Sequence, residues 1–273
     1  MHYAFTKDSI AFEAIALEST LLANMVNSVK NYFPGFMESI KPAFDSLSNI
    51  TPPTLSKLFK SKTLEDKLNE AKYENVKYLK VSVPEGFNGN YLEYLELLNE
   101  TLSYFDASYQ SINEYYVLVS SIVTNKEAKK SLKDETKEYK DLEKSRMVLN
   151  DKISDMFKAR STEALSTFGK HFKTNKEYSG AVVAASVLDR HLRAINIETV
   201  KGKVKQIVDV LSILIEQADK GNIAYMTPEV TKNIAFGAKE VAHQVEFLSV
   251  NLYRTIGALT ALDDTSERVE RFI

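Results

Sequence analysis

Apolar residues recur at steps of three and four along most of this chain, which is the spacing of one face of an α-helix. The longest segments with this pattern cover residues 90–125, 126–156, 175–195, 197–221 and 228–262. Nine glycines and six prolines leave few places where the chain could turn. The pattern therefore predicts an all-α fold, an elongated bundle of long antiparallel helices, with the 90–124 and 228–262 helices at its centre.

The first fifty residues are predicted to form a separate N-terminal helical arm. Asp8 or Ser9 can cap a helix, and the sequence FPG at 33–35 ends it. The apolar positions between these signals form one stripe: Ile10, Ala14, Leu17, Leu21, Met25, Val29 and Phe33. We therefore expect two parts, an arm over residues 1–50 and a main helical domain with one continuous core over residues 51–273.

Two short segments have the composition of β-strands. VKYLKVSVP at 76–84 and NIAYM at 222–226 are rich in β-branched and aromatic residues, and each lies beside a turn. They are candidates for a minor two-stranded β element, although two loops fit the sequence equally well. The clearest helix start is MTPEV, where Thr227 can cap and Pro228 suits the first helical position.

Composition removes several classes of function. The chain has no cysteine, which excludes disulfides, thiolate catalysis, thiolate zinc sites and cysteine-ligated iron–sulfur clusters. The formal charge of −2 gives no general attraction to nucleic acid, and acidic residues interrupt the lysine-rich run at 126–144. Acidic residues within the first twenty positions argue against a secretory signal. The longest apolar run, at 180–188, is half the length needed for a membrane span.

Candidate chemistry is sparse. The glycines form no phosphate-binding loop, and neither the zinc-protease helix motif nor the nucleophile-elbow motif is present. Glu240 and His243 have the Glu-x-x-His spacing of di-iron helical bundles, but such bundles need this motif twice and it occurs once. We therefore predict no catalytic residue, no metal site and no cofactor. The fourteen tyrosines could form a stacking platform, but their helical spacing favours core positions.

The order of these segments resembles the helical virion proteins, internal head or structural, of large-genome tailed bacteriophages. The likeness rests on the N-terminal arm, on NGNYLEYLELLNETLSYFD and EYKDLEKSRMVLNDKISDMF, and on the closing segment that begins MTPEVTKNIAFGAKEVAHQ. The resemblance implies a non-enzymatic structural or packaged component of the virion, present in the host cytoplasm before assembly. Its implied partners are other virion proteins and further copies of itself.

The same resemblance implies a role for two glutamates of the arm. Packaged proteins of that class carry leaders that a phage protease cuts after a short motif ending in Glu, and Ala11-Phe-Glu13 and Ala16-Leu-Glu18 have this form. Glu13 and Glu18 are thus candidate processing positions. They are not a catalytic pair, because five residues of helix place them about 140° apart.

Two other classes of function fit the sequence. Long amphipathic helices and the small residues at 180–188 are compatible with a pore-forming or membrane-interacting protein. A helical face could also serve an intracellular adaptor that engages host machinery.

Overall fold

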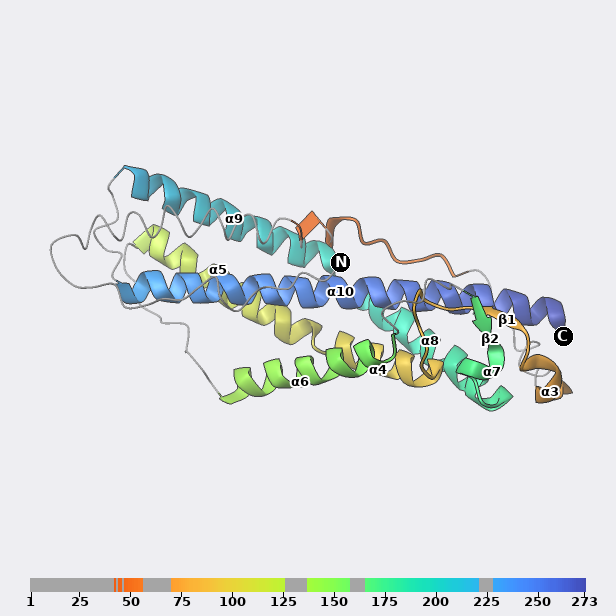
Figure 1. Cartoon of the computed structure of the whole chain (residues 1–273). Coiled ribbons are helices and arrows are strands. Elements are labelled where there is room, and N and C mark those ends of the chain that lie inside the picture. The colour runs from red at the N-terminus through yellow and green to blue at the C-terminus, as the bar shows by residue number, and fades with distance from the viewer. Residues whose placement is uncertain are drawn as a thin grey trace.

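The computed structural model describes residues 42, 44–45, 47–55, 70–125, 137–157, 165–220 and 228–273. This part of the chain is elongated and built mainly from helices (Figure 1). The predicted all-α fold is therefore confirmed. The elements in chain order are α3 (Tyr73–Val76), β1 (Lys80–Ser82), α4 (Tyr91–Ser103), α5 (Phe105–Asn125), α6 (Lys137–Asp155), β2 (Leu165–Thr167), α7 (Phe168–His171), α8 (Asn175–Ala194), α9 (Ile197–Asp219) and α10 (Pro228–Phe272).

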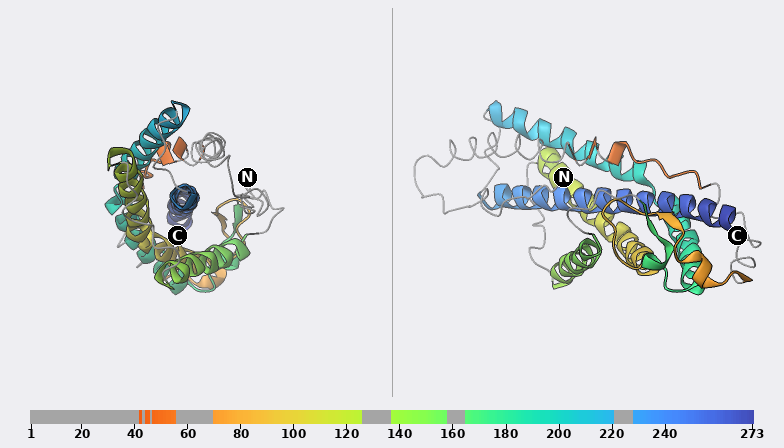
Figure 2. Two further views of the ribbon diagram at one scale, coloured as in Figure 1. Left: turned by 90° about the vertical axis from the view of Figure 1, so that its left-hand side faces the viewer. Right: turned by 45° about the vertical axis from the view of Figure 1, so that its right-hand side comes forward.

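Helix α10 is the spine of the molecule. Its 45 residues give a length of about 68 Å at 1.5 Å per residue. α4, α5 and α8 pack along it, and the view down its axis shows the other helices arching around it (Figure 2). α5 and α9 run in the opposite direction to α10 (Figure 1). The spine thus joins most of the described elements into one body.

Three buried tyrosines fasten neighbouring helices to this spine. The Tyr91 hydroxyl of α4 donates to the Ala258 carbonyl at 2.7 Å, and the Tyr115 hydroxyl of α5 donates to the Ile234 carbonyl at 3.0 Å. The Tyr178 hydroxyl of α8 donates to Ser266 Oγ at 2.8 Å. Each ring lies in the common apolar core, so these tyrosines occupy the core positions that their spacing predicted.

The last helix begins where the sequence predicted, with Pro228 at its first position, but it continues past the predicted end at 262 to Phe272. The extension is held by tertiary contacts. Thr265 Oγ1 donates to the Ser82 carbonyl at 2.9 Å, Ser266 accepts from Tyr178, and Val269 is fully buried. The residues after position 262 are mostly polar, but Thr265 and Ser266 among them face neighbouring elements.

The single helix predicted over 90–124 is wrong, because α4 ends at Ser103 and α5 begins at Phe105. Tyr104 has φ −82° and ψ 0°, outside the helical region. Just before it, Thr101 Oγ1 donates to the Leu98 carbonyl and Ser103 Oγ to the Glu100 carbonyl, each at 2.7 Å. Such hydroxyl bonds compete with the helical ladder and bend it. The break lets α4 pack on α8 while α5 packs on α9 and α10.

A two-stranded antiparallel sheet is present, but with a different partner from the one the sequence suggested. β1 lies within the predicted 76–84 segment and pairs with β2, with Val81 opposite Ser166. The predicted partner, 222–226, lies outside the described residues. β2 is only three residues long, and the pairing continues where the Phe168 amide donates to the Leu79 carbonyl at 2.8 Å. β1 also packs against α10.

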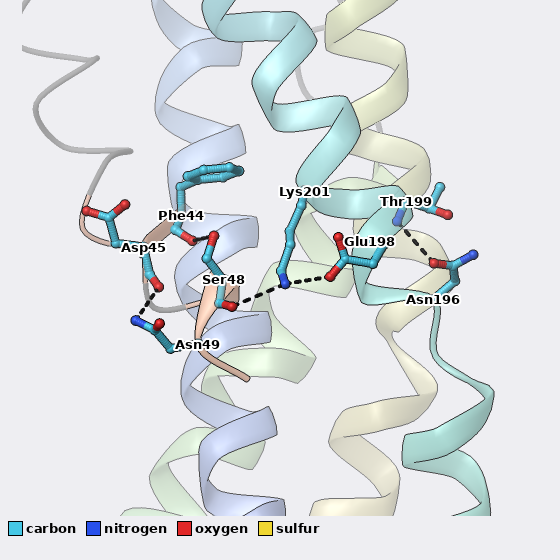
Figure 3. A network of polar contacts seen from close by, with 8 residues as sticks. All are labelled: Phe44, Asp45, Ser48, Asn49, Asn196, Glu198, Thr199 and Lys201. Atoms are coloured by element: carbon cyan, nitrogen blue, oxygen red, sulfur yellow. Dashed lines mark hydrogen bonds and ion pairs between the residues drawn. The ribbon is translucent and has the colours of Figure 1, made fainter. Parts of the chain in front are cut away.

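Residues 44–45 and 47–55 lie against the beginning of α9 (Figure 3). Lys201 Nζ donates to the Ser48 carbonyl at 3.4 Å and to Glu198 Oε1 at 2.7 Å. Leu47 and Ile50 are buried in the same core as the main helices. The division into an arm over 1–50 and a domain over 51–273 stays a prediction, since only the last part of the arm is described.

Candidate functional site

Buried polar side chains concentrate on the spine. In the described part of the chain, α10 carries Gln244, Ser249, Asn251, Thr255, Thr265 and Ser266 in buried positions. Polar side chains of the described residues also gather where α10 faces α6, and we call this set of residues the polar seam. Its members are Glu143, Arg146 and Asn150 of α6 and Glu240, His243, Gln244, Asn251 and Arg254 of α10.

Arg146 forms the first link across the seam. Its side chain is 6% exposed, Nη1 donates to Gln244 Oε1, and the guanidinium lies over the Phe247 ring at 5.4 Å. Burial lowers the pKa of Arg146, and the nearby charge of Glu143 opposes that shift. Among the described residues no carboxylate forms an ion pair with Arg146. A buried cation is thus held by an amide and an aromatic face.

Arg254 forms the second link. Its Nη1 donates to Asn150 Oδ1 at 3.1 Å and to Asn251 Oδ1 at 3.5 Å. Burial lowers the pKa of Arg254. Burial raises the pKa of Tyr94, and the positive charge of Arg254 opposes that shift. The Tyr94 hydroxyl has no hydrogen-bond partner among the described residues. Asn150 lies one helical turn after Arg146, so both links come from one face of α6.

Glu240 and His243, which the sequence singled out, lie one turn apart on α10 and both are half-buried. Burial raises the pKa of Glu240 to about 7. The pKa of His243 is lowered by burial and by the charges of Lys239 and Arg146, against the opposing charge of Glu143. The described residues contain no group of three or more histidines and carboxylates that could hold a metal ion. A di-iron site would need a second such pair on a neighbouring helix, and the described part of the chain does not bring one to Glu240 and His243.

The chemistry open to the polar seam follows from this geometry. A carboxyl group with a pKa near 7 can exchange a proton at neutral pH. Proton transfer in catalysis also needs a substrate within hydrogen-bond reach. The described pocket of about 330 Å³ lies elsewhere, between α3 and the C-terminus, and is lined by Glu70, Ala71, Asn75, Val76, Phe272 and Ile273. The contacts of the seam instead join α6 to α10.

Outside the polar seam, His171 of α7 is another buried titratable group. Its Nδ1 lies 2.9 Å from the Gly89 carbonyl, which assigns the proton to Nδ1, and its ring stacks on Phe87 at 5.2 Å. Nε2 has no partner among the described residues, and burial lowers the pKa of this histidine. His171 thus belongs to an aromatic cluster that holds the sheet end of the molecule together.

The processing positions that the resemblance implied, Glu13 and Glu18, lie outside the described residues. Sequence reasoning missed the burial of Arg146, because charges of both signs alternate through the surrounding segment and a charged side chain is normally exposed. One signal was present: Arg146, Leu149 and Ile153 share helical spacing, and all three are buried. No protein-family model, no curated protein and no solved structure matches this chain. Within the described ranges, no helix is both long enough and apolar enough to cross a bilayer.

Proposed function

We propose that this chain is a non-enzymatic structural component of a bacteriophage virion, and that it acts through protein–protein contacts. The observation that carries the proposal is the spine: one 45-residue helix, about 68 Å long, to which most of the described body is fastened. A helix of this length fixes the distance between surfaces at its two ends. The sequence resemblance to helical virion proteins supplies the assignment to a phage particle.

The use of polar groups in the described structure supports this role. Tyr91, Tyr115 and Tyr178 each donate from a neighbouring helix to α10, and the polar seam joins α6 to the same spine. These groups hold elements in position, since their partners are other residues of the chain. A chain built in this way suits a component that keeps its shape while partners bind its outer surface.

Mass spectrometry of gradient-purified particles from the encoding phage tests the proposal. We expect peptides of this chain in the fraction that carries infectivity, at a constant copy number per particle across independent preparations. The same spectra identify the mature N-terminus, and a start at Ala14 or Ser19 would support processing after Glu13 or Glu18. Recovery of the chain only from the soluble lysate, bound to host proteins, would contradict the proposal and favour an adaptor.

A further inference from the structure

The outer side of α8 leaves two apolar side chains in water. Val183 is 63% exposed and Val187 is 41% exposed, and they lie one helical turn apart. Lys176 and Arg190 continue the same exposed line towards the two ends of the helix. Because removing apolar surface from water is favourable, this line is a candidate contact surface.

Helix α4 carries an acidic line beside these residues. Glu93, Glu96 and Glu100 recur at steps of three and four, and all three are exposed. Among the described residues, none of these carboxylates and neither of the two basic side chains on α8 forms an ion pair. The hydrogen bond of Arg190 is to the Ser186 carbonyl of its own helix, at 3.4 Å. These charges are therefore free to pair with another molecule.

The two lines face the same side of the molecule. α4 and α8 run parallel, since the Asn90 amide donates to Glu177 at 3.3 Å near their starts. Near their ends, His191 Nδ1 lies 3.2 Å from Asn99 Oδ1. Each exposed line lies about 80° around its helix from the positions that contact the other helix, in opposite senses. We call the combined surface the α4–α8 face: Glu93, Glu96 and Glu100 of α4 with Lys176, Val183, Val187 and Arg190 of α8.

We propose that two copies of this chain pair through the α4–α8 face, with their α8 helices parallel about a two-fold axis. Val183 and Val187 of the two copies then meet at the centre. Because Asn99 lies beside His191 in each chain, Glu100 is level with Arg190 of the second copy. The acidic line of each copy thus faces the basic residues of the other, as a self-complementary two-fold interface requires.

Charge selects this arrangement over the antiparallel one. If the two α8 helices packed antiparallel about a two-fold axis, α4 of one copy would lie over α4 of the other. Glu96, which lies near the level of Val183 and Val187, would then face its own equivalent. Like charges that face each other across an interface are unfavourable. The parallel arrangement avoids this contact and pairs opposite charges instead.

The size of the α4–α8 face fits a weak but specific dimer. The 20 residues of α8 give a length of about 30 Å, and two helices packed about 9 Å apart are about 18 Å wide. Pairing would bury about 500 Å² on each copy, about 1,000 Å² in total, which is the lower limit for a specific interface. The pairing supplies a partner for the proposed structural role, but it is tested on the purified chain, so either can fail without the other.

Sedimentation velocity of the purified full chain tests the proposal. We expect a dimer that forms with rising concentration, that salt weakens, and that Val183→Glu dissociates. Val117→Glu, on the outer side of α5, is the matched control and should leave the dimer intact, since Val117 is 53% exposed and lies outside the face. Both positions are exposed, so both variants should unfold at the same temperature as the native chain.

A charge exchange tests the predicted contact between Glu100 and Arg190. Glu100→Arg and Arg190→Glu should each weaken the dimer about tenfold, because each places like charges opposite one another. The double variant restores an attractive pair and should recover most of the affinity. A double variant as weak as either single variant would contradict this contact and the arrangement built on it.

A cross-link tests the parallel direction. The chain has no cysteine, and Val183 of one copy would lie beside Val183 of the other. Val183→Cys alone should therefore give a disulfide-linked dimer under mild oxidation, whereas Val117→Cys should not. A monomer at every concentration, or a dimer that Val183→Glu leaves intact, would overturn the proposal. A disulfide that forms only between Val183→Cys and Val187→Cys chains would also overturn it, because that pairing is antiparallel.

Discussion

Buried tyrosine hydroxyls differ in whether they have a hydrogen-bond partner among the described residues, and this difference gives a prediction at the residue scale. Tyr115→Phe removes the bond to the Ile234 carbonyl and should lower the free energy of unfolding by about 1 kcal/mol. Tyr94→Phe removes a buried hydroxyl that has no partner among the described residues, so it should be neutral or slightly stabilising. Urea unfolding of both variants measures the difference. Equal losses in the two variants would contradict the assigned bonds.

Glu240 gives a pH-dependent prediction. Its pKa in the folded chain, about 7, lies above the ordinary value of 4.5, so the folded state disfavours the ionised form. The native chain should therefore lose stability as the pH rises from 4.5 to 7 and lose no more from this group above pH 7. Glu240→Gln cannot ionise and should escape this loss, gaining about 1–3 kcal/mol over the native chain at pH 8 and nothing at pH 4.

Chemical denaturation of both chains across this pH range tests the prediction. The contribution of His171 has the opposite sign, since its lowered pKa removes stability as the pH falls below 6.5. It is present in both chains and cancels in the comparison. A difference between Glu240→Gln and the native chain that stays constant from pH 4 to 8 would mean that Glu240 is solvated like an ordinary surface carboxyl.

At the scale of elements, two helical glycines make a matched pair. No atom of the described residues outside α9 lies within 4 Å of a β-carbon placed at Gly202, so Gly202→Ala should stabilise the chain by about 0.5–1 kcal/mol. At Gly180 of α8, the same β-carbon would lie 3.3 Å from Leu92 Cδ2 of α4. Gly180→Ala should therefore lack this gain, because Leu92 must shift. Thermal unfolding compares them, and a larger gain for Gly180→Ala would refute close packing of α4 on α8.

The limits of sequence prediction are also clearest at this scale. Helical spacing and the Pro228 signal predicted where the long helices lie, because those signals are local. The break at Tyr104 has no glycine or proline to mark it and depends on hydroxyl bonds and on packing against different helices. β2 was missed because Leu-Ser-Thr has no strand pattern of its own and is ordered by its pairing with β1.

At the candidate site, too, local spacing could be predicted from the sequence and tertiary contacts could not. The sequence could place Glu240 and His243 one turn apart on a helix, since that spacing is local. It could not show that Arg146 would be buried against Gln244, 98 positions later in the chain, because that contact depends on how α6 packs. A charged residue is normally read as exposed, and only its helical spacing with Leu149 and Ile153 pointed to the buried face.

At the scale of the whole molecule, the continuity of α10 decides whether the chain can hold a fixed distance between partner surfaces. The helix has contacts along its length. Near its start, Ile234 accepts a hydrogen bond from Tyr115 of α5, and near its end Thr265 donates to Ser82. A break within it would divide the body into two parts that could move separately. The proposed structural role therefore depends on this one element being straight and unbroken in solution.

The most direct test is a distance measurement between spin labels at Lys239→Cys and Arg268→Cys in the full chain. Both residues are exposed, and 29 residues of continuous helix separate them by about 44 Å. Double electron–electron resonance should give one narrow distribution centred near that distance. A broad distribution, or a main distance well below about 44 Å, would show that the helix is broken and would contradict the rigid spine on which the proposed function rests.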